Sequence, residues 1–273
     1  MNTLYIVPTP IGNLEDITLR ALRILKEVAL IAAEDTRTTR ILLNRYEITT
    51  PLTAYHEHNK LAKLDTIFNA LSSGDVALVS DAGTPGISDP GYELIREAIQ
   101  RQVNVIPLPG PSAVVTALVA SGLPTDGYVY LGFLPRKAKA LREALEAIAV
   151  ERRTLVLYES PNRLVDTLTA LIEVIGDRPV AVARELTKIY EEVQRGPASE
   201  VRAYYELHEP RGEITLVIGG APVNASVKWD EQQVIAALKA RLAIGDPRKQ
   251  AAKAVAAQSG WDSREVYALS IEL

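Results

Sequence analysis

Short apolar runs alternate with stretches of helical periodicity along the first part of the chain. The runs predict strands at residues 4–7, 30–33, 52–55, 76–80 and 103–108. Apolar residues recur between them at helical spacing, with one face formed by Leu19, Leu22, Leu25 and Val28 and a later helix pattern running over 61–71. Continuous apolar strands that alternate with helices are typical of a parallel sheet covered on both faces. The pattern therefore predicts an α/β fold.

A second series of strands and helices follows the turn residues at 122–127. It predicts strands at 128–133, 154–158, 180–184, 192–195 and 213–219, and helices at 138–149 and 164–174. Arg195, Gly196 and Pro197 indicate a turn before a short helix that ends near Leu207. We predict a first α/β domain at 1–123, a second at 124–222, and a linker with a small helical tail at 223–273.

The tail is rich in alanine and lysine and contains no strand-like run. A helical stretch at 251–256 precedes a glycine-containing turn at 259–261, and Asp262 or Ser263 can cap the helix that follows. This order is the signature of a helix-turn-helix. Two interpretations stay open, namely contact with nucleic acid and a bundle used only for packing. The first would use the charges of Arg248, Lys249, Lys253 and Arg264.

The amino-acid composition limits the kinds of protein to which this chain can belong. The 273 residues are 47% hydrophobic and 23% charged, which is ordinary for a soluble globular protein. The chain contains no cysteine, which excludes disulfides and thiolate metal sites and fits a cytoplasmic protein. No apolar stretch is long enough for a membrane span, and no signal core opens the chain. A net charge of −4 disfavours a uniformly basic nucleic-acid binder, so any RNA contact must use local patches.

The segment 79–91 joins a predicted strand to a helix that begins near Tyr92. It contains glycines, prolines and two aspartates, in the sequence Val-Ser-Asp-Ala-Gly-Thr-Pro-Gly-Ile-Ser-Asp-Pro-Gly. Such a loop forms a ligand crevice at the carboxyl edge of an α/β sheet. It has neither the lysine of a Walker loop nor the dinucleotide fingerprint. Asp81 and Asp89 suit a ligand with hydroxyl groups or positive charge better than one rich in phosphate.

Polar clusters follow other predicted strands too, at 9–13, 34–37, 55–59, 109–113, 159–161 and 184–188, and their counterpart at 211–213 lies at the start of the last predicted strand. One cluster at one strand end is routine capping, and Ser112 is placed to cap a helix, as Asp16 or Thr18 is for the first. Many clusters at one edge of two domains predict a shared cleft.

Classical catalytic sets are absent from these clusters. His56 and His58 lack a third nitrogen or thiolate partner, so we expect a polar loop or a substrate contact and no metal site. Glu34 and Asp35 are candidates for acid–base chemistry, but neighbouring strand residues point to opposite faces unless the strand has ended. No Ser-His-Asp or Cys-His arrangement can be assigned.

Six ordered motifs carry a resemblance to a known family. They are Val-Pro-Thr-Pro-Ile-Gly-Asn-Leu, Ala-Glu-Asp-Thr-Arg, the 79–91 loop, Pro-Leu-Pro-Gly-Pro-Ser-Ala, Tyr-Glu-Ser-Pro and Ala-Arg-Glu-Leu-Thr-Lys. Together they resemble the tetrapyrrole methylase superfamily, and most closely its ribosomal branch, which methylates the ribose 2′-hydroxyl of a decoding-centre cytidine in 16S rRNA. Precorrin enzymes of the superfamily usually carry a shorter Gly-Asp-Pro form of the loop, whereas this chain has Gly-Ile-Ser-Asp-Pro at 86–90.

The resemblance implies two α/β domains with S-adenosylmethionine in the cleft between them, commonly in a homodimer. The cofactor residues that it implies are Pro10, Asp81, Ala82, Gly83, Thr84, Ile87, Ser88, Asp89, Ser112, Ala113, Tyr158, Ala183, Gly212, Glu213 and Ile214. Candidate proton acceptors are Glu34, Asp35, Glu159 and Glu185, with Arg37, Arg184 and Lys188 as electrostatic or phosphate partners. No single base is assigned, and an interdomain ion-pair network is the other interpretation of Arg184, Glu185 and Lys188.

The densest basic run predicts where RNA binds. It contains Arg136, Lys137 and Lys139, and His56 is a further candidate for substrate contact. The other interpretation of the run is a solvated helix face. We expect 16S rRNA, within the small ribosomal subunit, as the partner and no membrane. The alternatives are a precorrin-type tetrapyrrole methyltransferase and a non-enzymatic nucleic-acid-binding regulator.

Overall fold

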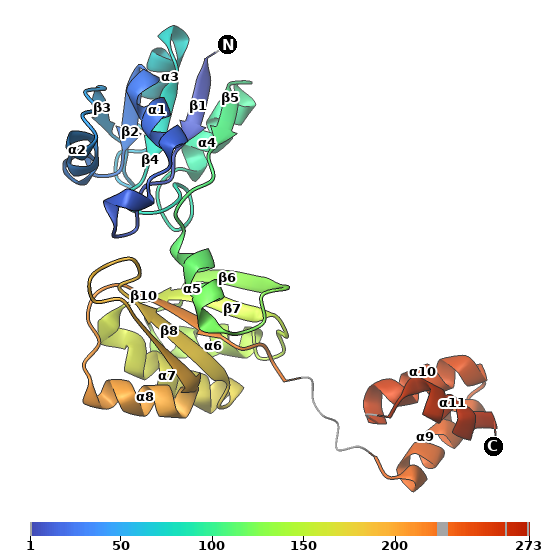
Figure 1. Ribbon diagram of the computed structural model, residues 1–273. Helices are drawn as coiled ribbons and strands as arrows, with labels where there is room; N and C mark the ends of the chain where they lie inside the picture. Colours follow the sequence, from blue (N-terminus) through green and yellow to red (C-terminus); the bar gives the residue numbers. More distant parts are fainter. Residues whose placement is uncertain (1, 223–228, 260, 272) are drawn as a thin grey trace. The chain divides into compact units, whose positions relative to one another are not determined.

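The computed structural model describes residues 2–222, 229–259, 261–271 and 273 (Figure 1). The predicted linker at 223–228 and Gly260 of the predicted turn lie outside the described residues. The chain divides into two compact units, Met1–Gly220 and Ala221–Leu273.

The first sheet of the larger unit is entirely parallel in its described strands, in the order β3-β2-β4-β1-β5. The strands are β1 (Thr3–Ile6), β2 (Leu30–Ala33), β3 (Leu52–Ala54), β4 (Val76–Val79) and β5 (Asn104–Pro107). Each predicted run coincides with the strand found there to within one residue at either end. Because all the strands run the same way, the loops that follow them meet at one edge of the sheet.

Helices cover both faces of this sheet, as the alternation predicted. Successive side chains of β4 point to opposite faces of the sheet, and both faces carry a hydrophobic core. Ala77 and Val79 pack in the first core, and Val76 and Leu78 pack in the second. The first core includes α1 (Leu19–Glu27) and α2 (Thr36–Arg45), and the second includes α3 (Leu64–Ser73) and α4 (Tyr92–Gln100). A short 3₁₀ turn, η1 (Leu14–Asp16), precedes α1.

Some helix details differ from the sequence prediction. Thr18 caps α1 as predicted, because its side chain accepts a hydrogen bond from the Ala21 amide at 3.0 Å. Leu19, which the spacing placed on the apolar face, is the first residue of the helix and is 87% exposed. The helix predicted from residue 61 begins at Leu64. Ser112 occupies the N-cap position of α5, but its side chain makes no capping hydrogen bond within the described structure.

The second sheet is mixed, in the order β6-β7-β10-β8-β9. Its strands are β6 (Tyr128–Phe133), β7 (Thr154–Glu159), β8 (Pro179–Arg184), β9 (Glu192–Pro197) and β10 (Ile214–Ile218). β6 and β7 are parallel, whereas β10 is antiparallel to β7 and β8, and β9 to β8. The turn predicted at 195–197 is wrong, because these residues continue β9. A proline is tolerated there since β9 is an edge strand and Pro197 is its last residue.

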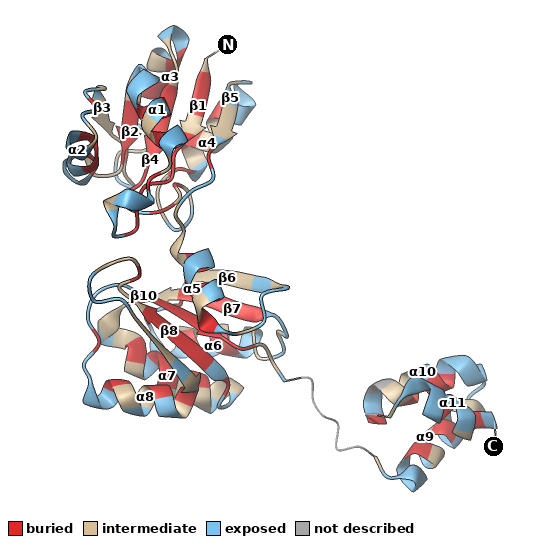
Figure 2. Cartoon of the chain, viewed as in Figure 1, coloured by how far each residue is buried: buried red, intermediate tan, exposed pale blue. Residues whose placement is uncertain are grey.

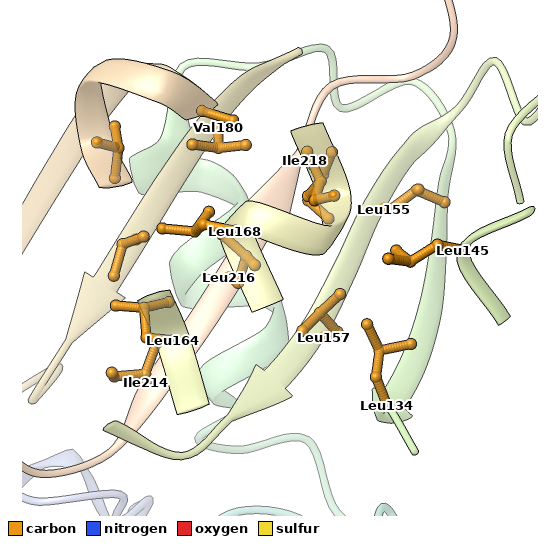
Figure 3. Packing of buried hydrophobic residues seen from close by; sticks show 14 of the residues in the cluster. Leu134, Leu145, Leu155, Leu157, Leu164, Leu168, Val180, Ile214, Leu216 and Ile218 are labelled. Carbon is orange, nitrogen blue, oxygen red and sulfur yellow. The ribbon is translucent and has the colours of Figure 1, made fainter. Parts of the chain in front are cut away.

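Helices also cover both faces of the second sheet. α6 (Ala138–Ala147), α7 (Leu164–Ile175) and α8 (Ala198–Leu207) pack on one face, around a leucine-rich core (Figure 3). The 3₁₀ turn η2 (Pro161–Arg163) leads into α7. α5 (Ala113–Ser121) packs on the other face through Val114, Ala117 and Leu118. α5 therefore packs on the second sheet, although the sequence predicts that the first domain ends later, at residue 123. The domain limits stay predictions.

The smaller unit contains α9 (Glu231–Ala243), α10 (Arg248–Ser259) and α11 (Ser263–Ile271) in its described part. Asp230 and Gln233 form a capping box at the start of α9. The helices share a core that includes Val234, Leu238 and Val266, while much of their outer surface is exposed (Figure 2). In the described residues of the chain, no helix has the length and apolar content that crossing a membrane requires.

Candidate active site

A pocket of about 380 Å³ lies where the two sheets of the larger unit approach each other. Loops that follow β1, β4 and β5 form one side, and the ends of β6, β7 and β8 with the start of β10 form the other. The register explains the second side, because Ile214 at the start of antiparallel β10 pairs with Glu159 and Arg184 at the ends of β7 and β8. The cleft that the polar clusters predicted is therefore present. Its volume is within the range of small-molecule sites.

The first side of the pocket lies at the point where the strand order of the parallel sheet reverses. β1 and β4 are neighbours, yet β1 connects to β2 on one side and β4 connects to β5 on the other. Ligands of open α/β sheets bind at such a point. The loops that leave these two strands are joined, since the amides of Thr9 and Gly83 each donate to the other residue's carbonyl at 2.9 Å.

The glycine- and proline-rich loop at 80–91 reaches across to the second sheet. Ser88 has a left-handed backbone, with φ of 63°, which is uncommon for a residue with a side chain. Its hydroxyl lies 2.6 Å from the Tyr130 hydroxyl of β6. Burial raises the pKa of Tyr130, so the phenol stays protonated and can take part in this hydrogen bond.

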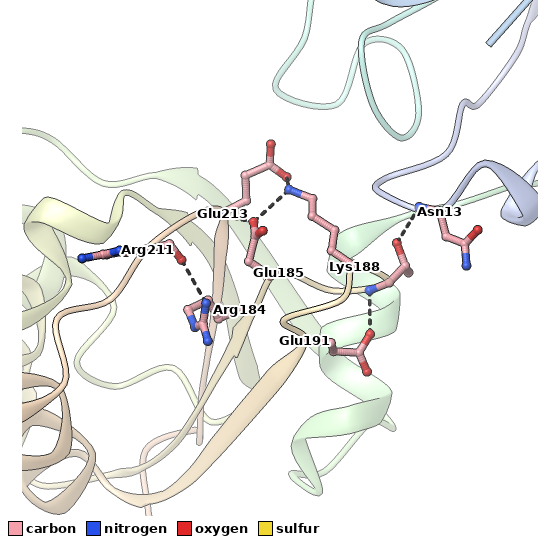
Figure 4. A network of polar contacts seen from close by, with 8 residues as sticks. Asn13, Arg184, Glu185, Lys188, Glu191, Arg211 and Glu213 are labelled. Atoms are coloured by element: carbon pink, nitrogen blue, oxygen red, sulfur yellow. Dashed lines mark hydrogen bonds and ion pairs between the residues drawn. The ribbon is translucent and has the colours of Figure 1, made fainter. Parts of the chain in front are cut away.

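A polar network holds the opposite wall (Figure 4). Lys188 donates to Glu185 at 2.8 Å and to Glu213 at 3.2 Å, and the Glu213 amide donates to Glu185 at 3.0 Å. The hydrogen bond from Lys188 is the largest cause of the lowered pKa of Glu185. The Asn13 amide, from the first sheet's β1 loop, donates to the Thr187 hydroxyl at 3.1 Å. The ion pairs of Glu185 and Lys188 lie within segments of the second sheet, and the Asn13–Thr187 hydrogen bond joins these segments to the first sheet. The interdomain ion-pair interpretation of Glu185 and Lys188 therefore stays a prediction.

The backbone of this wall is strained. Glu185 and Thr187 have left-handed φ values of 52° and 66°, and a β-branched threonine rarely adopts that region. Each such residue costs about 1–3 kcal/mol and persists only where its surroundings hold it. Here the Thr187 amide donates to Glu191 at 2.5 Å and the Glu185 amide to the Glu213 carbonyl at 2.9 Å. Strain of this kind clusters at functional sites.

Acidic side chains determine the charge of the pocket. Its described lining includes Asp89, Glu159 and Glu213 and contains neither lysine nor arginine. Burial is the main cause that raises the pKa of Asp89 to about 6, and the nearby charges of Glu34 and Asp81 raise it further. A cationic ligand would relieve this repulsion, whereas a phosphate would increase it. Asp89 lines the pocket and Asp81 does not, and the ligand with hydroxyl groups or positive charge that the loop suggested stays a prediction.

A second group of carboxylates lies at the edge of the first sheet, outside the pocket lining. β2 ends at Ala33, so Glu34 and Asp35 both follow the strand and both reach Asp81. The Asp35 amide donates to the Asp81 carboxylate at 3.0 Å, and the Asp81 amide donates to Glu34 at 3.3 Å. Burial raises the pKa of Glu34 and of Asp81. His56 is near enough for its charge to act on Glu34.

Asp35 differs from its neighbour Glu34. Its side chain accepts hydrogen bonds from Arg37, including one of 2.6 Å, and these lower its pKa to about 2. It also caps α2 by accepting from the Arg37 amide at 2.8 Å. A carboxylate this acidic and this well paired is a poor proton acceptor near neutral pH.

Glu159 is the most deeply buried of the candidate acceptors. Its side chain is 0% exposed and accepts hydrogen bonds from the Ser160 amide at 2.7 Å and the Thr167 hydroxyl at 2.6 Å. Arg163 lies 3.5 Å from it. These contacts tie the end of β7 to η2 and α7, which positions the backbone of the pocket wall.

Basic residues predicted for the site lie outside the pocket. Arg184 donates to Glu192 at 3.1 Å and lines a separate pocket with Glu185. The side chains of Arg37 and Lys139 are 90% and 91% exposed, and Arg136 and Lys137 are also exposed. Such side chains are accessible to a large polyanion.

The implied cofactor residues assemble well. All of them line the pocket except Asp81 and Pro10. Pro10 is buried in the loop after β1. The roles of the implied cofactor residues stay predictions. Sequence reasoning missed Phe133 and Thr215, which line the pocket from strand ends. Strand alternation gave no signal for them, because only the pairing of β6 with β7, and of β10 with β8, places these residues at the cleft. Among the described residues, no group of three or more histidine or acidic side chains is arranged to hold a metal ion.

The larger unit thus combines one parallel sheet and one mixed sheet around an acid-lined pocket. A family model for tetrapyrrole (corrin/porphyrin) methylases matches residues 3–202, and the chain belongs to this family. The resemblance carried by the six motifs and the predicted fold class are thereby confirmed.

Individual relatives are similar along nearly the whole chain. "Ribosomal RNA small subunit methyltransferase I" of Halalkalibacterium halodurans is 47% identical, covering 97% of this chain and 93% of that protein. The protein of the same name from Synechocystis sp. is 45% identical, covering 100% and 99%. A crystal structure of uroporphyrin-III C-methyltransferase from Thermus thermophilus, complexed with S-adenosylhomocysteine, shares the fold. Its TM-score is 0.57 at 21% identity, covering 80% of this chain and 97% of that one.

Proposed function

We propose that this protein transfers a methyl group from S-adenosylmethionine to the ribose 2′-hydroxyl of a cytidine in 16S rRNA. The observation that carries the proposal is the acid-lined pocket between the sheets, in a chain whose relatives are named for methylation of small-subunit rRNA. The target nucleotide rests on the motif resemblance. We propose a homodimer and a cytoplasmic location on the same basis.

The residues of the pocket fit the cofactor. S-adenosylmethionine supplies a methyl group on a positively charged sulfonium. The pocket favours this positive charge, because its described lining is acidic and contains neither lysine nor arginine. Asp89 and Glu213 would carry that attraction. The start of α5 at Ala113 also lines the pocket, and a helix N-terminus favours the carboxylate of the amino-acid part. Tyr158 offers an aromatic wall for the adenine, with Phe133 next to it at a ring distance of 5.5 Å.

Alignment would supply most of the catalysis. Methyl transfer to oxygen is an in-line displacement, and holding the reactants in place can contribute roughly 7–11 kcal/mol. The 2′-hydroxyl must also lose its proton. Glu34 is our proposed acceptor, because it lies close enough to the pocket residue Asp89 for its charge to act there and burial raises its pKa, whereas Asp35 is tied to Arg37 and Glu185 to Lys188. Glu159 is proposed as a positioning residue, since hydrogen bonds from within the protein occupy both of its oxygens.

The exposed basic residues would hold the RNA backbone. Arg136, Lys137 and Lys139 form one candidate patch at the start of α6, and Arg37 extends from the edge of the first sheet. Binding should weaken by about 0.7 log units per tenfold salt for each phosphate contacted on a single strand. Removing the three α6 charges should reduce this salt slope and leave cofactor affinity unchanged.

Transfer of tritium from labelled S-adenosylmethionine tests the proposal. The purified protein is incubated separately with small ribosomal subunits, naked 16S rRNA, uroporphyrinogen and no acceptor. Label in the RNA of either ribosomal sample, at a ribose 2′-oxygen, supports the proposal. Label in the tetrapyrrole alone would establish the alternative activity, and RNA binding without any transfer would favour the non-enzymatic regulator.

A further inference from the structure

A second pocket of about 410 Å³ lies next to the first and shares Gly212 with it. Its walls are the end of β8, the start of β9, the last turns of α8 and the segment 208–212. The proposed cofactor contacts and proton acceptor leave this pocket unused. It is built from different side chains than the first pocket, with several aromatic rings and two arginines.

Aromatic rings provide stacking surfaces here. Tyr204 and His208 stack, with ring centroids 4.3 Å apart and an interplanar angle of 19°. Tyr205 meets Tyr204 edge-on at 5.0 Å, which fixes the pair from the other side. His208 and Tyr190 are both exposed, and Tyr190 is 70% exposed. A preformed stack with an exposed outer ring suits a flat, conjugated ligand.

Tyr205 supports this stack from within the protein. It is 3% exposed and its hydroxyl is fully buried, so a ligand in the pocket does not reach that atom. Burial, and after it the charge of Glu192, raise the pKa of this phenol, so it stays protonated. Its ring holds Tyr204 in place, and the exposed rings are left to contact a ligand.

The charges of the pocket limit the kind of ligand. Arg184 neutralises Glu192 at 3.1 Å, and Lys188 neutralises Glu185 at 2.8 Å. Arg211 is 85% exposed at its side chain and is only loosely paired with Glu209, at 4.0 Å. One accessible guanidinium in a pocket whose lining also holds three glutamates suits a single phosphate group and disfavours a triphosphate.

We infer that the second pocket binds one unpaired nucleotide of the RNA strand that carries the methylation target. Its base stacks on Tyr190 and His208, and its phosphate lies against Arg211. The shared Gly212 places this nucleotide beside the proposed cofactor pocket, so that holding it would position the strand for reaction. The inference rests on the proposed function for the identity of the RNA.

Substitutions in the full-length protein test the inference. The probe is a fluorescein-labelled, single-stranded RNA of about nine nucleotides, the scale of a single-strand site, measured by anisotropy, and methyl transfer to small subunits is followed in parallel. Tyr190→Ala should weaken binding of the RNA by about 5- to 150-fold, the range expected for one stacked base. Arg211→Ala should weaken it with unchanged resistance to urea and should reduce the salt slope by about 0.7, because one phosphate contact is lost and Arg211 is 85% exposed. A merely structural role for Arg211 would not change the salt slope.

Tyr128→Ala is the matched control, since Tyr128 is 41% exposed at the opposite end of β6. Binding of S-adenosylmethionine should be unchanged in all three variants. RNA affinity in Tyr190→Ala and Arg211→Ala equal to that of the control would overturn the inference, as would a change in oligomeric state in Tyr190→Ala. Failure of the wild-type protein to methylate RNA would instead count against the proposed function.

Discussion

Asp89 is the side chain whose environment changes its chemistry most clearly. Its pKa of about 6 lies above the ordinary value of 3.8, chiefly because of burial. The folded protein therefore binds a proton more tightly here than the unfolded chain does. Stability that is fully present below about pH 4 is lost as the pH rises toward and through 6.

Asp89→Asn should remove this loss. We expect the variant to match the wild type near pH 4 and to be more stable above pH 6, by no more than about 3 kcal/mol. Its affinity for S-adenosylmethionine should fall by about 1.5–3 kcal/mol, because a charged partner of the cofactor is gone. Urea unfolding from about pH 4 to 8, which brackets both pKa values, and calorimetry measure the two effects. Asp126→Asn, at an exposed turn, is the control, and parallel stability curves for wild type and Asp89→Asn would contradict the prediction.

Gly12 determines how closely the β1 loop approaches the Glu185–Lys188 wall. A Cβ atom at this position would lie 2.5 Å from Lys188 Cγ and 2.7 Å from Thr187 Oγ1. Gly12→Ala should therefore separate the loops and break the hydrogen bond from Asn13 to Thr187, at a cost of about 1–3 kcal/mol. We expect weaker cofactor binding in isothermal calorimetry. Gly127→Ala, whose Cβ would come no closer than 3.4 Å to Arg153, should bind normally. Equal affinities in the two variants would contradict this account.

At the level of elements, Glu159 joins β7 to α7. Thr167→Val keeps the side-chain shape but leaves a buried carboxylate oxygen without its donor, so we expect a loss of about 1.5–3 kcal/mol in the free energy of unfolding. Thr169→Val is the control, since Thr169 donates only to the Val165 carbonyl within the same helix. Urea denaturation compares them. A Glu159→Gln protein that stays as stable as the wild type yet loses methyl transfer would instead indicate a direct catalytic role.

Elements also show which parts of the structure the sequence could predict. Buried strands such as β4 carry their signal in a continuous apolar run, and the 80–91 loop carries its signal in glycine, proline and aspartate. The packing of α5 on the second sheet could not be predicted from sequence. Its apolar residues are spread around the helix, so no single apolar face indicates which sheet it covers. The Ser88–Tyr130 contact and the strain at Thr187 join segments far apart in sequence, so no local pattern could reveal them.

For the molecule as a whole, the division into two units separates the pocket from the helical tail. The smaller unit has its own core, and the pocket lies wholly in the larger one. A protein ending at residue 222 should fold and bind S-adenosylmethionine with unchanged affinity. If the tail contacts RNA, this shorter protein should bind small ribosomal subunits more weakly, with a smaller salt slope because it neutralises fewer phosphates. Calorimetry and filter binding test this. Loss of cofactor binding would contradict the independence of the units.

The most direct test of the central claim is mass-spectrometric mapping of 16S rRNA after incubation with the protein and S-adenosylmethionine carrying a deuterated methyl group. The account predicts one labelled methyl group, on the ribose 2′-oxygen of a cytidine, and its loss when Asp89 is replaced by asparagine at low cofactor concentration. A label on a base, or RNA that stays unlabelled while the cofactor binds, would contradict it.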